Sequence, residues 1–284
     1  MTQSTAPLRP IEAVVIGGSA GSVDALMAIL PALQPTCGVA VMAKASIPGR
    51  TKTRLVPPLT FEEAAQCNTA FLRDIADNIL VASAQASIAG YMAFGPPHAK
   101  SFFEESMPTD IGLIEAWYPN FGDCLVAAIT QLLGRGHRGA VVLNSDSPTL
   151  PTSLLVETAD VLASPGDRAV LGPAHDGGYY LLGLKSAHHR LFQDIAWSTE
   201  HVARQSLERA AELGLSVHIL PRWYDVDDIG TFKMLQAELS DGQSFVPGLR
   251  PNEPKHTRAL MQSLHENPDF KERLSFNAFR RAAE

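Results

Sequence analysis

The feature that most constrains the fold of this chain is a repeated alternation of short apolar runs with longer amphipathic segments. The apolar runs have the length of buried β-strands, and the intervening segments carry apolar residues at helical spacing. Strands that alternate with helices predict a mainly parallel, twisted α/β sheet that is covered by helices on both faces. Ligands of such sheets bind at the carboxyl ends of the strands, so polar residues that directly follow a strand are the first candidates for a site.

These patterns predict the position of each element. Thr60 and Glu63 have the spacing of a capping box, which marks the start of a long helix. The predicted strands are 13–16, 39–42, 86–94, 110–118, 139–143, 169–172, 179–184 and 216–220. The predicted helices are 23–33, 60–80, 121–133, 151–162, 198–214 and 228–239.

The chain divides into three predicted parts. Residues 1–38 form an N-terminal extension with an extra strand–helix unit, and residues 39–240 form the main domain. Residues 241–284 begin as a proline-containing linker and continue as a charged tail with one or two short helices. Glycines and Asp24 interrupt the apolar stretch 13–33, which argues against a membrane span or a signal peptide.

Charge and cysteine content exclude several classes of protein. The formal net charge of −7 disfavours a general nucleic-acid binder, which needs a basic surface. The three cysteines are odd in number and form no CxxC motif, so neither a disulfide scaffold nor a cysteine zinc site is expected. This usage fits a reducing cytoplasm. The absence of HExxH disfavours a histidine-based metal site.

A cationic loop follows the predicted strand 39–42. Lys44, Arg50, Lys52 and Arg54 provide four positive charges, and Gly49 lets the backbone approach a ligand closely. Such a loop can bind the phosphates of a nucleotide, although it is not a Walker A loop. The alternative is a solvated basic loop without a ligand.

Two acidic segments also follow predicted strands. Asp146 stands at the tip of strand 139–143, where it can hold a divalent cation or cap the following helix. Asp225 and Asp227 alternate in an extended stretch and can therefore share one face, while Asp228 is placed to cap the last helix. Together with the cationic loop, these carboxylates predict a site for a nucleotide with Mg²⁺ or Mn²⁺.

A glycine-rich turn supplies the candidate acceptor site. Asp176 can act as a base or as an anchor for a hydroxyl group, and Gly177, Gly178 and Tyr179 follow it directly. The same sequence is also a strong hairpin signal. Trp197 is either a core residue or a surface on which a ligand stacks, and Ser198 or Thr199 is a candidate helix cap.

A second, unrelated motif lies near the N-terminus. Gly17 to Gly21 matches GxSxG between a predicted strand and a predicted helix, which makes Ser19 a candidate nucleophile of a serine esterase. No histidine or aspartate stands at a position that identifies it as the partner of Ser19.

Residues 39–239 resemble a known bacterial family. The resemblance rests on VAVMAKASIPGRTKTRL, DSPTLP, DGGYYLLGL, WST and WYDVD, which occur in this order. They resemble the GT-A superfamily of glycosyltransferases, of the type assigned to arsenosugar biosynthesis, and the loop and helix at 44–80 also resemble phospholactate guanylyltransferases. The resemblance implies a three-layer, Rossmann-like fold of nucleotide-diphospho-sugar transferases with a mainly parallel mixed sheet.

The resemblance also assigns roles to residues. It implies that Lys44, Arg50, Lys52 and Arg54 hold nucleotide phosphates. It implies that Asp146 and Asp227, with Asp225 beside them, hold Mg²⁺ or Mn²⁺. The turn at 176–178 would face a small-molecule acceptor, with Asp176 as the candidate catalytic group and Tyr179 and Trp197 beside it. The expected activity is glycosyl transfer from a nucleotide-sugar, and nucleotidyl transfer to a phosphorylated or carboxylate acceptor is the alternative.

Three residues depart from the pattern of the resembled family and leave other hypotheses about the activity open. Cys124 replaces an expected arginine, Ser145 replaces a glycine, and His175 replaces an acid. These changes keep a catalytically silent nucleotide-binding protein among the hypotheses. Residues 11–41 resemble the start of a chemotaxis-receptor methylesterase domain, in which Ser19 would be the nucleophile.

Overall fold

The computed structural model describes residues 36–242 and 244–274 of the chain. The predicted strand–helix unit at 13–33 and the candidate nucleophile Ser19 lie outside the described residues. The end of the predicted tail, beyond residue 274, also lies outside them.

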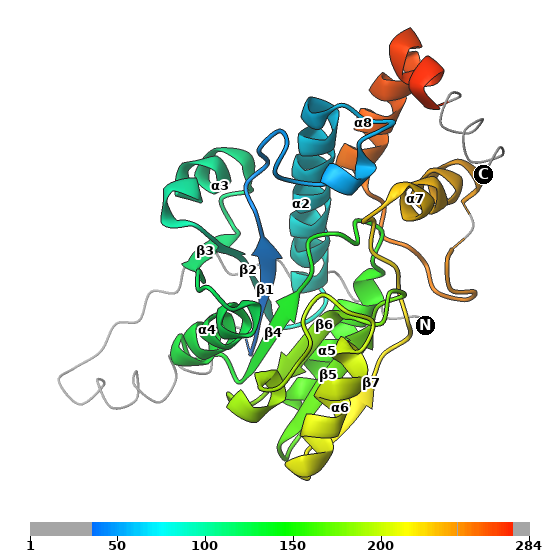
Figure 1. The fold of residues 1–284 in the computed structure, drawn as a ribbon. Helices are drawn as coiled ribbons and strands as arrows, with labels where there is room; N and C mark the ends of the chain where they lie inside the picture. Colours follow the sequence, from blue (N-terminus) through cyan, green and yellow to red (C-terminus); the bar gives the residue numbers. More distant parts are fainter. Residues whose placement is uncertain (1–35, 243, 275–284) are drawn as a thin grey trace, which may run out of the picture.

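The centre of the described chain is a seven-stranded sheet with the order β3-β2-β1-β4-β6-β5-β7. Its strands are β1 (Cys37–Ala43), β2 (Ile88–Phe94), β3 (Gly112–Glu115), β4 (Gly139–Leu143), β5 (Arg168–Pro173), β6 (Tyr179–Leu184) and β7 (Ser216–Ile219). Only β6 runs antiparallel to its neighbours, and all other neighbouring pairs are parallel. The predicted mainly parallel mixed sheet is therefore confirmed. Figure 1 shows β1 and β4 pointing the same way at the centre of the molecule.

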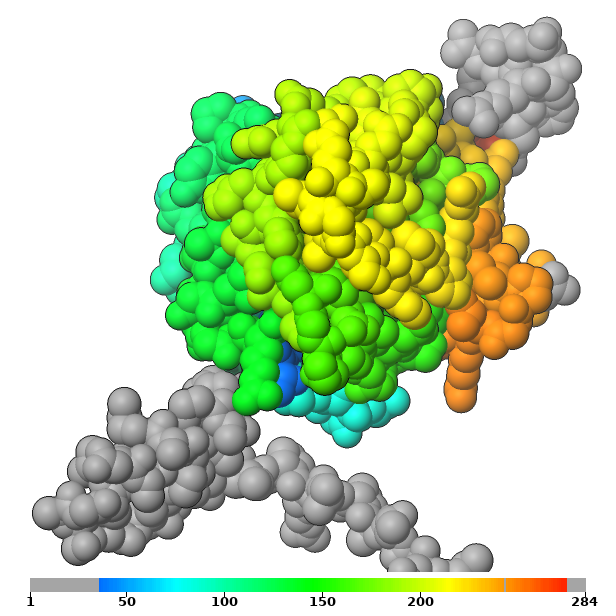
Figure 2. All heavy atoms as spheres, turned by 90° about the horizontal axis from the view of Figure 1, so that it is seen from below, coloured from blue at the N-terminus to red at the C-terminus, as the bar shows by residue number. Residues whose placement is uncertain are grey.

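Helices cover both faces of this sheet. The described helical segments are η1 (Thr53–Leu55), α2 (Phe61–Ser83), η2 (Pro97–Ala99), α3 (Lys100–Ser106), α4 (Phe121–Gly134), α5 (Thr152–Ala163), η3 (His189–Phe192), α6 (Val202–Glu212), α7 (Ile229–Asp241) and α8 (Lys255–Glu266). Apolar residues of α2, α3, α5, α7 and α8 share one core cluster, and those of α4 and α6 share another. Seen from below, the α6–β7 region (yellow) lies between the green central elements and the orange C-terminal segment (Figure 2).

The alternation of side chains along each strand explains why the two cores form. Val39 and Val41 of β1 lie in the first core, whereas Ala40 between them lies in the second. Val141 and Val142 of β4 divide between the two cores in the same way. Successive side chains of a strand point to opposite faces of the sheet, so continuous apolar runs are suited to strands that are buried on both sides.

The predicted capping signals have the expected geometry. The Thr60 hydroxyl accepts a hydrogen bond from the Glu63 amide, and the Glu63 carboxylate accepts one from the Thr60 amide. Asp228 caps α7 together with Thr231 in the same reciprocal way. These two cap predictions are confirmed, and both caps satisfy amide groups that a helix end leaves unpaired.

The helix predicted at 198–214 begins later than expected. Ser198 has a φ of 65°, in the left-handed region, which an α-helix cannot accommodate. The Thr199 hydroxyl donates to the Ala196 carbonyl, and the residue before α6 is His201, which makes no side-chain cap. The prediction of Ser198 or Thr199 as the cap is therefore wrong. The short helix α3 was not predicted, because seven residues are too few to establish a helical period.

The predicted C-terminal segment packs against the main domain. Both carboxylate oxygens of Asp74 in α2 accept hydrogen bonds from the first turn of α8, at 2.8 Å from the amides of His256 and Thr257. A carboxylate at this end of a helix also interacts favourably with the helix dipole. None of the described helices is long and apolar enough to cross a membrane.

Candidate functional site

A cavity of about 560 Å³ collects almost all of the predicted site residues. It lies at the edge of the sheet where β1 and β4 end, as expected for ligand sites in open α/β sheets. The predicted residues that line it are Lys44, Arg50, Lys52, Arg54, Asp146, Asp176, Gly178, Tyr179, Trp197, Asp225 and Asp227. Among the described residues that were predicted for the transferase site, Gly177 alone is absent from the lining.

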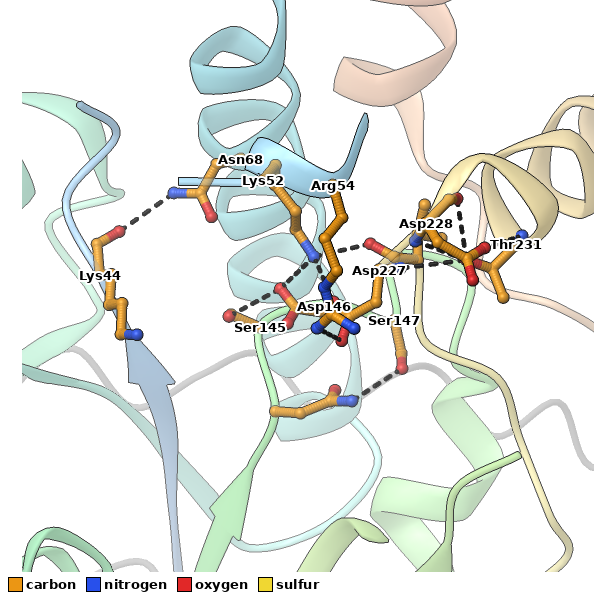
Figure 3. A network of polar contacts seen from close by, with 12 residues as sticks. Lys44, Lys52, Arg54, Asn68, Ser145, Asp146, Ser147, Asp227, Asp228 and Thr231 are labelled. Atoms are coloured by element: carbon orange, nitrogen blue, oxygen red, sulfur yellow. Dashed lines mark hydrogen bonds and ion pairs between the residues drawn. The ribbon is translucent and has the colours of Figure 1, made fainter. Parts of the chain in front are cut away.

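The Lys52 ammonium is the centre of the polar network in this cavity. Its Nζ lies 2.7 Å from Oδ1 of Asp146 and 3.1 Å from Oδ1 of Asp227, and it donates to the carbonyl oxygen of Val226 at 2.7 Å (Figure 3). Its side chain is only 6% exposed. Burial by itself lowers the pKa of Lys52, but the two carboxylates outweigh it and raise the pKa above its ordinary value. Lys52 is therefore a buried cation with an oxygen partner for each of its three donors.

The other three cations of the loop are arranged differently. Arg54 lies 3.0 Å from Oδ2 of Asp227, but its side chain is 73% exposed, so solvent weakens this ion pair. Within the described chain, Lys44 and Arg50 form no ion pair. Figure 3 shows Lys44 apart from the network, and its carbonyl oxygen accepts a hydrogen bond from Asn68 at 3.0 Å. Lys44 and Arg50 are thus the two cations whose charge is available to a phosphate.

The two acidic segments meet in the folded chain. The Val226 amide donates to the Asp146 carbonyl at 2.8 Å, which fixes the loop after β7 beside the tip of β4. The Ser145 hydroxyl donates to Oδ1 of Asp146 at 3.0 Å. Helix α5 starts at Thr152 after Pro151, so the alternative role of Asp146 as a helix cap is not observed.

Asp225 is the most perturbed carboxyl group of this cavity. Its pKa is raised from 3.8 to about 7 by burial and by the nearby charges of Asp176, Asp227 and Asp146. Four carboxylates therefore share a region in which Lys52 is the only buried cation among the described residues. Lys52 and Arg54 pair with Asp146 and Asp227, whereas Asp176 and Asp225 form no ion pair among the described residues.

The oxygen atoms at this point fit a hard divalent ion. Carboxylate oxygens of Asp146 and Asp227 are typical ligands of Mg²⁺ and Mn²⁺, and both contact the same ammonium group. In the described chain, no cluster of three or more His, Cys, Asp or Glu side chains could hold a metal ion through protein side chains alone. A divalent ion here would need further oxygen atoms from phosphate or water, which is the usual manner of Mg²⁺ binding.

The turn between β5 and β6 is a hairpin, as one of the two readings of its sequence predicted. Oδ1 of Asp176 accepts a hydrogen bond from the Gly178 amide at 2.8 Å, and Asp176 lines the cavity. Gly177 has a φ of 91°, and a Cβ atom on it would lie 2.3 Å from the backbone oxygen of Glu200. The glycine at this position is required by close backbone packing against the segment before α6.

One half of the cavity lining is apolar and aromatic. Phe121 and Trp197 contact each other edge to face, with ring centroids 5.4 Å apart. Two buried polar atoms beside this half have no hydrogen-bond partner among the described residues, namely Oδ1 of Asn144 and the hydroxyl of Tyr179. The other apolar residues of this half are Met42, Leu125, Val142 and Val202.

Sequence reasoning missed some of the lining residues. Asn144 directly follows β4, so the signal that identified Asp146 could also have identified it. Asn68 and Phe121 also line the cavity. They gave no signal, because an asparagine within a helix and an aromatic residue at a helix start do not indicate a site by themselves.

The three departures from the family pattern fall at different distances from the cavity. Ser145 lines it and contacts Asp146. Cys124 is buried, with its Sγ against the backbone of Tyr118, and the ring of His175 packs on Phe245 at 5.8 Å. Neither Cys124 nor His175 lines the cavity. All three cysteines of the chain are buried and form no disulfide.

The raised pKa of Asp225 predicts a pH-dependent effect on stability. Its protonated form favours the folded state below the unfolded pKa of 3.8, and this contribution is lost as the pH rises through the folded pKa of about 7. Asp225→Asn should therefore increase the free energy of unfolding of the metal-free protein by about 1–2 kcal/mol at pH 8, after allowance for solvent screening. The gain should approach zero near pH 4. Denaturant unfolding at both pH values measures it.

Asp110→Asn is the matched control, because Asp110 is exposed and lies outside the cavity. A gain for Asp225→Asn that is equal at pH 4 and pH 8 would contradict the assigned cause.

Comparisons with known proteins agree with this fold. Residues 79–199 match the profile of a family described as an uncharacterized protein conserved in bacteria (DUF2064). No curated protein matches the chain. A crystal structure of a candidate nucleotide-diphospho-sugar transferase from Desulfovibrio desulfuricans G20 matches with a TM-score of 0.71 and 22% identity, over 84% of this chain and 99% of that one.

Two further solved structures are more distant. A CMP:2-keto-3-deoxy-manno-octonic acid synthetase in complex with CTP matches with a TM-score of 0.47 and 10% identity, over 73% of this chain and all of the other. A cytidylyltransferase from Leptospira borgpetersenii matches with a TM-score of 0.48 and 11% identity, over 83% and 96% of the two chains. The chain thus has the Rossmann-like α/β fold of the Desulfovibrio protein. The family description names no activity, so the arsenosugar type stays a prediction.

Proposed function

We propose that this protein is a divalent-metal-dependent transferase that uses a nucleotide-sugar as glycosyl donor and a small molecule as acceptor. The observation that carries the proposal is the meeting of the cationic loop 44–54 with Asp146 and Asp227 in one cavity. The fold shared with the Desulfovibrio protein, itself described as a candidate transferase of this kind, supports it.

The donor half of the cavity would bind the diphosphate. Lys44 and Arg50 carry charge that no described carboxylate neutralises, and the loop carries them directly after β1. Asp146 and Asp227 would hold Mg²⁺ or Mn²⁺, and the ion would neutralise charge on the diphosphate leaving group. Lys44 and Arg50 would thus bind the diphosphate directly, and Asp146 and Asp227 would bind it through the metal ion.

The acceptor half would bind and activate a hydroxyl group. The Asp176 carboxylate accepts a hydrogen bond from the Gly178 amide and lines the cavity, where it would accept a proton from the acceptor. Asp225 is a second candidate base, because a pKa near 7 suits proton transfer at neutral pH. Trp197 and Phe121 offer an aromatic surface to the body of the acceptor.

Charge in the acceptor half favours glycosyl over nucleotidyl transfer. A nucleotidyl acceptor with a phosphate or carboxylate group would need a cation there. Every lysine and arginine of the described cavity lining belongs to the loop 44–54, and the residues that we assign to the acceptor, Asp176, Tyr179 and Trp197, include no cation. A neutral hydroxyl compound suits this environment better than an anion.

The remaining alternatives have less support. A catalytically silent nucleotide-binding protein would use Lys44 and Arg50 in the same way, but it would have no use for a carboxyl group such as Asp225, whose raised pKa suits proton transfer. An esterase that uses Ser19 depends on residues outside the described part of the chain. We place the transferase in the cytoplasm, because its three thiols are free.

A thermal-shift screen with nucleoside triphosphates, diphosphates and nucleotide-sugars, each with and without Mn²⁺, tests the proposed function. We expect a Mn²⁺-dependent rise in melting temperature with a nucleoside diphosphate or its sugar, of several degrees at saturating ligand. A rise with one triphosphate alone would indicate nucleotidyl transfer instead. The absence of any shift would contradict nucleotide binding and direct attention to Ser19.

A further inference from the structure

Each of the three donors of the Lys52 ammonium group points to an oxygen atom that suits a divalent cation. Two of these oxygens belong to the carboxylates of Asp146 and Asp227, and the third is the carbonyl of Val226. Carboxylate and backbone carbonyl oxygens are the ligands that hard divalent ions use in proteins. The ammonium group therefore lies at the point where these oxygens would converge on a metal ion.

The position of Lys52 conflicts with two roles expected from the sequence. With its three donors used and its side chain buried, Lys52 has no donor left for a nucleotide phosphate. A divalent ion also cannot bind Asp146 and Asp227 together while the ammonium lies between them, since the two positive charges would repel at close range. Both roles require Lys52 to move.

We propose that the Lys52 ammonium group occupies the position of the divalent ion in the ligand-free protein. Its contacts with Asp146 and Asp227 break when the metal ion and the nucleotide bind together. This inference rests on the proposed function. The entering nucleotide provides phosphate oxygens as new partners of the displaced ammonium group. The metal ion replaces the positive charge that Lys52 had placed beside the two carboxylates. The protein then binds the ion weakly by itself and tightly with a nucleotide.

The neighbouring loop residues are consistent with such an exchange. Lys52 itself has a φ of 53°, and Gly49 three residues earlier has a φ of 75°, so two residues of the loop are in the left-handed region. Arg54 already lies on the solvent side of Asp227 and can retain one of its oxygens while Lys52 moves. The charge of the two carboxylates therefore stays partly compensated during the exchange.

Mn²⁺ binding without nucleotide tests the proposal directly. Lys52→Met keeps most of the length of the side chain and removes its charge. We expect the variant to bind Mn²⁺ at least about tenfold more tightly than the wild type, because the competing cation is gone. Electron paramagnetic resonance of free Mn²⁺ measures the affinity. Lys44→Met is the matched control, since Lys44 also lines the cavity but contacts neither carboxylate, and it should leave the Mn²⁺ affinity unchanged.

A second measurement covers the case in which Lys52→Met folds poorly, because it leaves two carboxylates without their buried partner. Addition of Mn²⁺ should then raise the melting temperature of the variant by more than it raises that of the wild type. In the wild type, the nucleoside diphosphate with the largest shift in the screen should raise the Mn²⁺ affinity at least about tenfold. Tight Mn²⁺ binding to the wild type without nucleotide, or equal Mn²⁺ affinity of wild type and Lys52→Met, would overturn the proposal.

The outcomes separate this inference from the proposed function. If the nucleotide binds with Mn²⁺ but Lys52→Met leaves the Mn²⁺ affinity unchanged, the transferase proposal survives and the role of Lys52 is refuted. If Lys52→Met binds Mn²⁺ tightly but no nucleotide or nucleotide-sugar binds either protein, the exchange with a metal is supported and the transferase proposal fails.

Discussion

Asp146→Asn is expected to lower the affinity for a nucleoside diphosphate in the presence of Mn²⁺ by about 100-fold, equivalent to about 2.7 kcal/mol. Asp146 is one of the two carboxylates that contact Lys52, and it is the group at the tip of β4 that would contact the ion. Asparagine keeps the shape of the side chain and an oxygen for the Ser145 hydroxyl, but it removes the charge that attracts a divalent cation. Isothermal titration calorimetry with and without Mn²⁺ measures the loss.

The loss should depend on the metal. Without Mn²⁺, the residual affinity for the nucleotide should be similar in wild type and variant, because Lys44 and Arg50 are unchanged. Asp110→Asn, at an exposed position outside the cavity, is the control and should bind as the wild type does. An unchanged Mn²⁺-dependent affinity of a folded Asp146→Asn protein would refute the metal role of this residue.

Gly177→Ala should produce the largest loss of stability, about 3 kcal/mol in the free energy of unfolding. The added Cβ atom would lie 2.3 Å from the backbone oxygen of Glu200, and backbone cannot rotate away as a side chain can. The φ of 91° adds a cost that glycine does not have. Denaturant unfolding of wild type and variant provides the comparison.

Gly214→Ala is the matched control for this prediction. Gly214 also has a positive φ, 62°, but a Cβ atom on it would meet nothing within 4 Å. Gly214→Ala should therefore lower the free energy of unfolding by only about 1 kcal/mol, the cost of a left-handed residue without a steric clash. Equal losses for the two variants would show that the contact with Glu200 relaxes on substitution, and that the turn does not depend on this close approach.

The regular elements could be predicted because their signals are local. The continuous apolar runs of β1 and β4, and the cap residues Thr60 and Asp228, are each contained within a few residues of sequence. The start of α6 could not be predicted, because the left-handed turn at Ser198 belongs to the loop that packs on Gly177. The short helix α3 could not be predicted, because seven residues are too few to establish a helical period.

The candidate site was predicted in its composition but only partly in its arrangement. Cations and acids after successive strands pointed to one edge of the sheet, and the cavity there contains them. Tyr179 and Trp197 were predicted to line the site, but Asn144 and Phe121 were not. Phe121, the first residue of α4, lines the cavity only when α4 packs on the sheet, and packing partners far apart in sequence leave no local pattern.

The sequence by itself thus determined the α/β alternation, the two acidic segments and the cationic loop, since periodicity and charge are properties of neighbouring residues. Only the tertiary structure decided which cation pairs with which acid. Lys52 contacts Asp227 across 175 positions of the chain, while Lys44 and Arg50 of the same loop contact no carboxylate among the described residues. Four similar charges in one loop are equivalent until the fold buries one of them, and a buried ammonium is stable only where oxygen atoms from distant segments surround it.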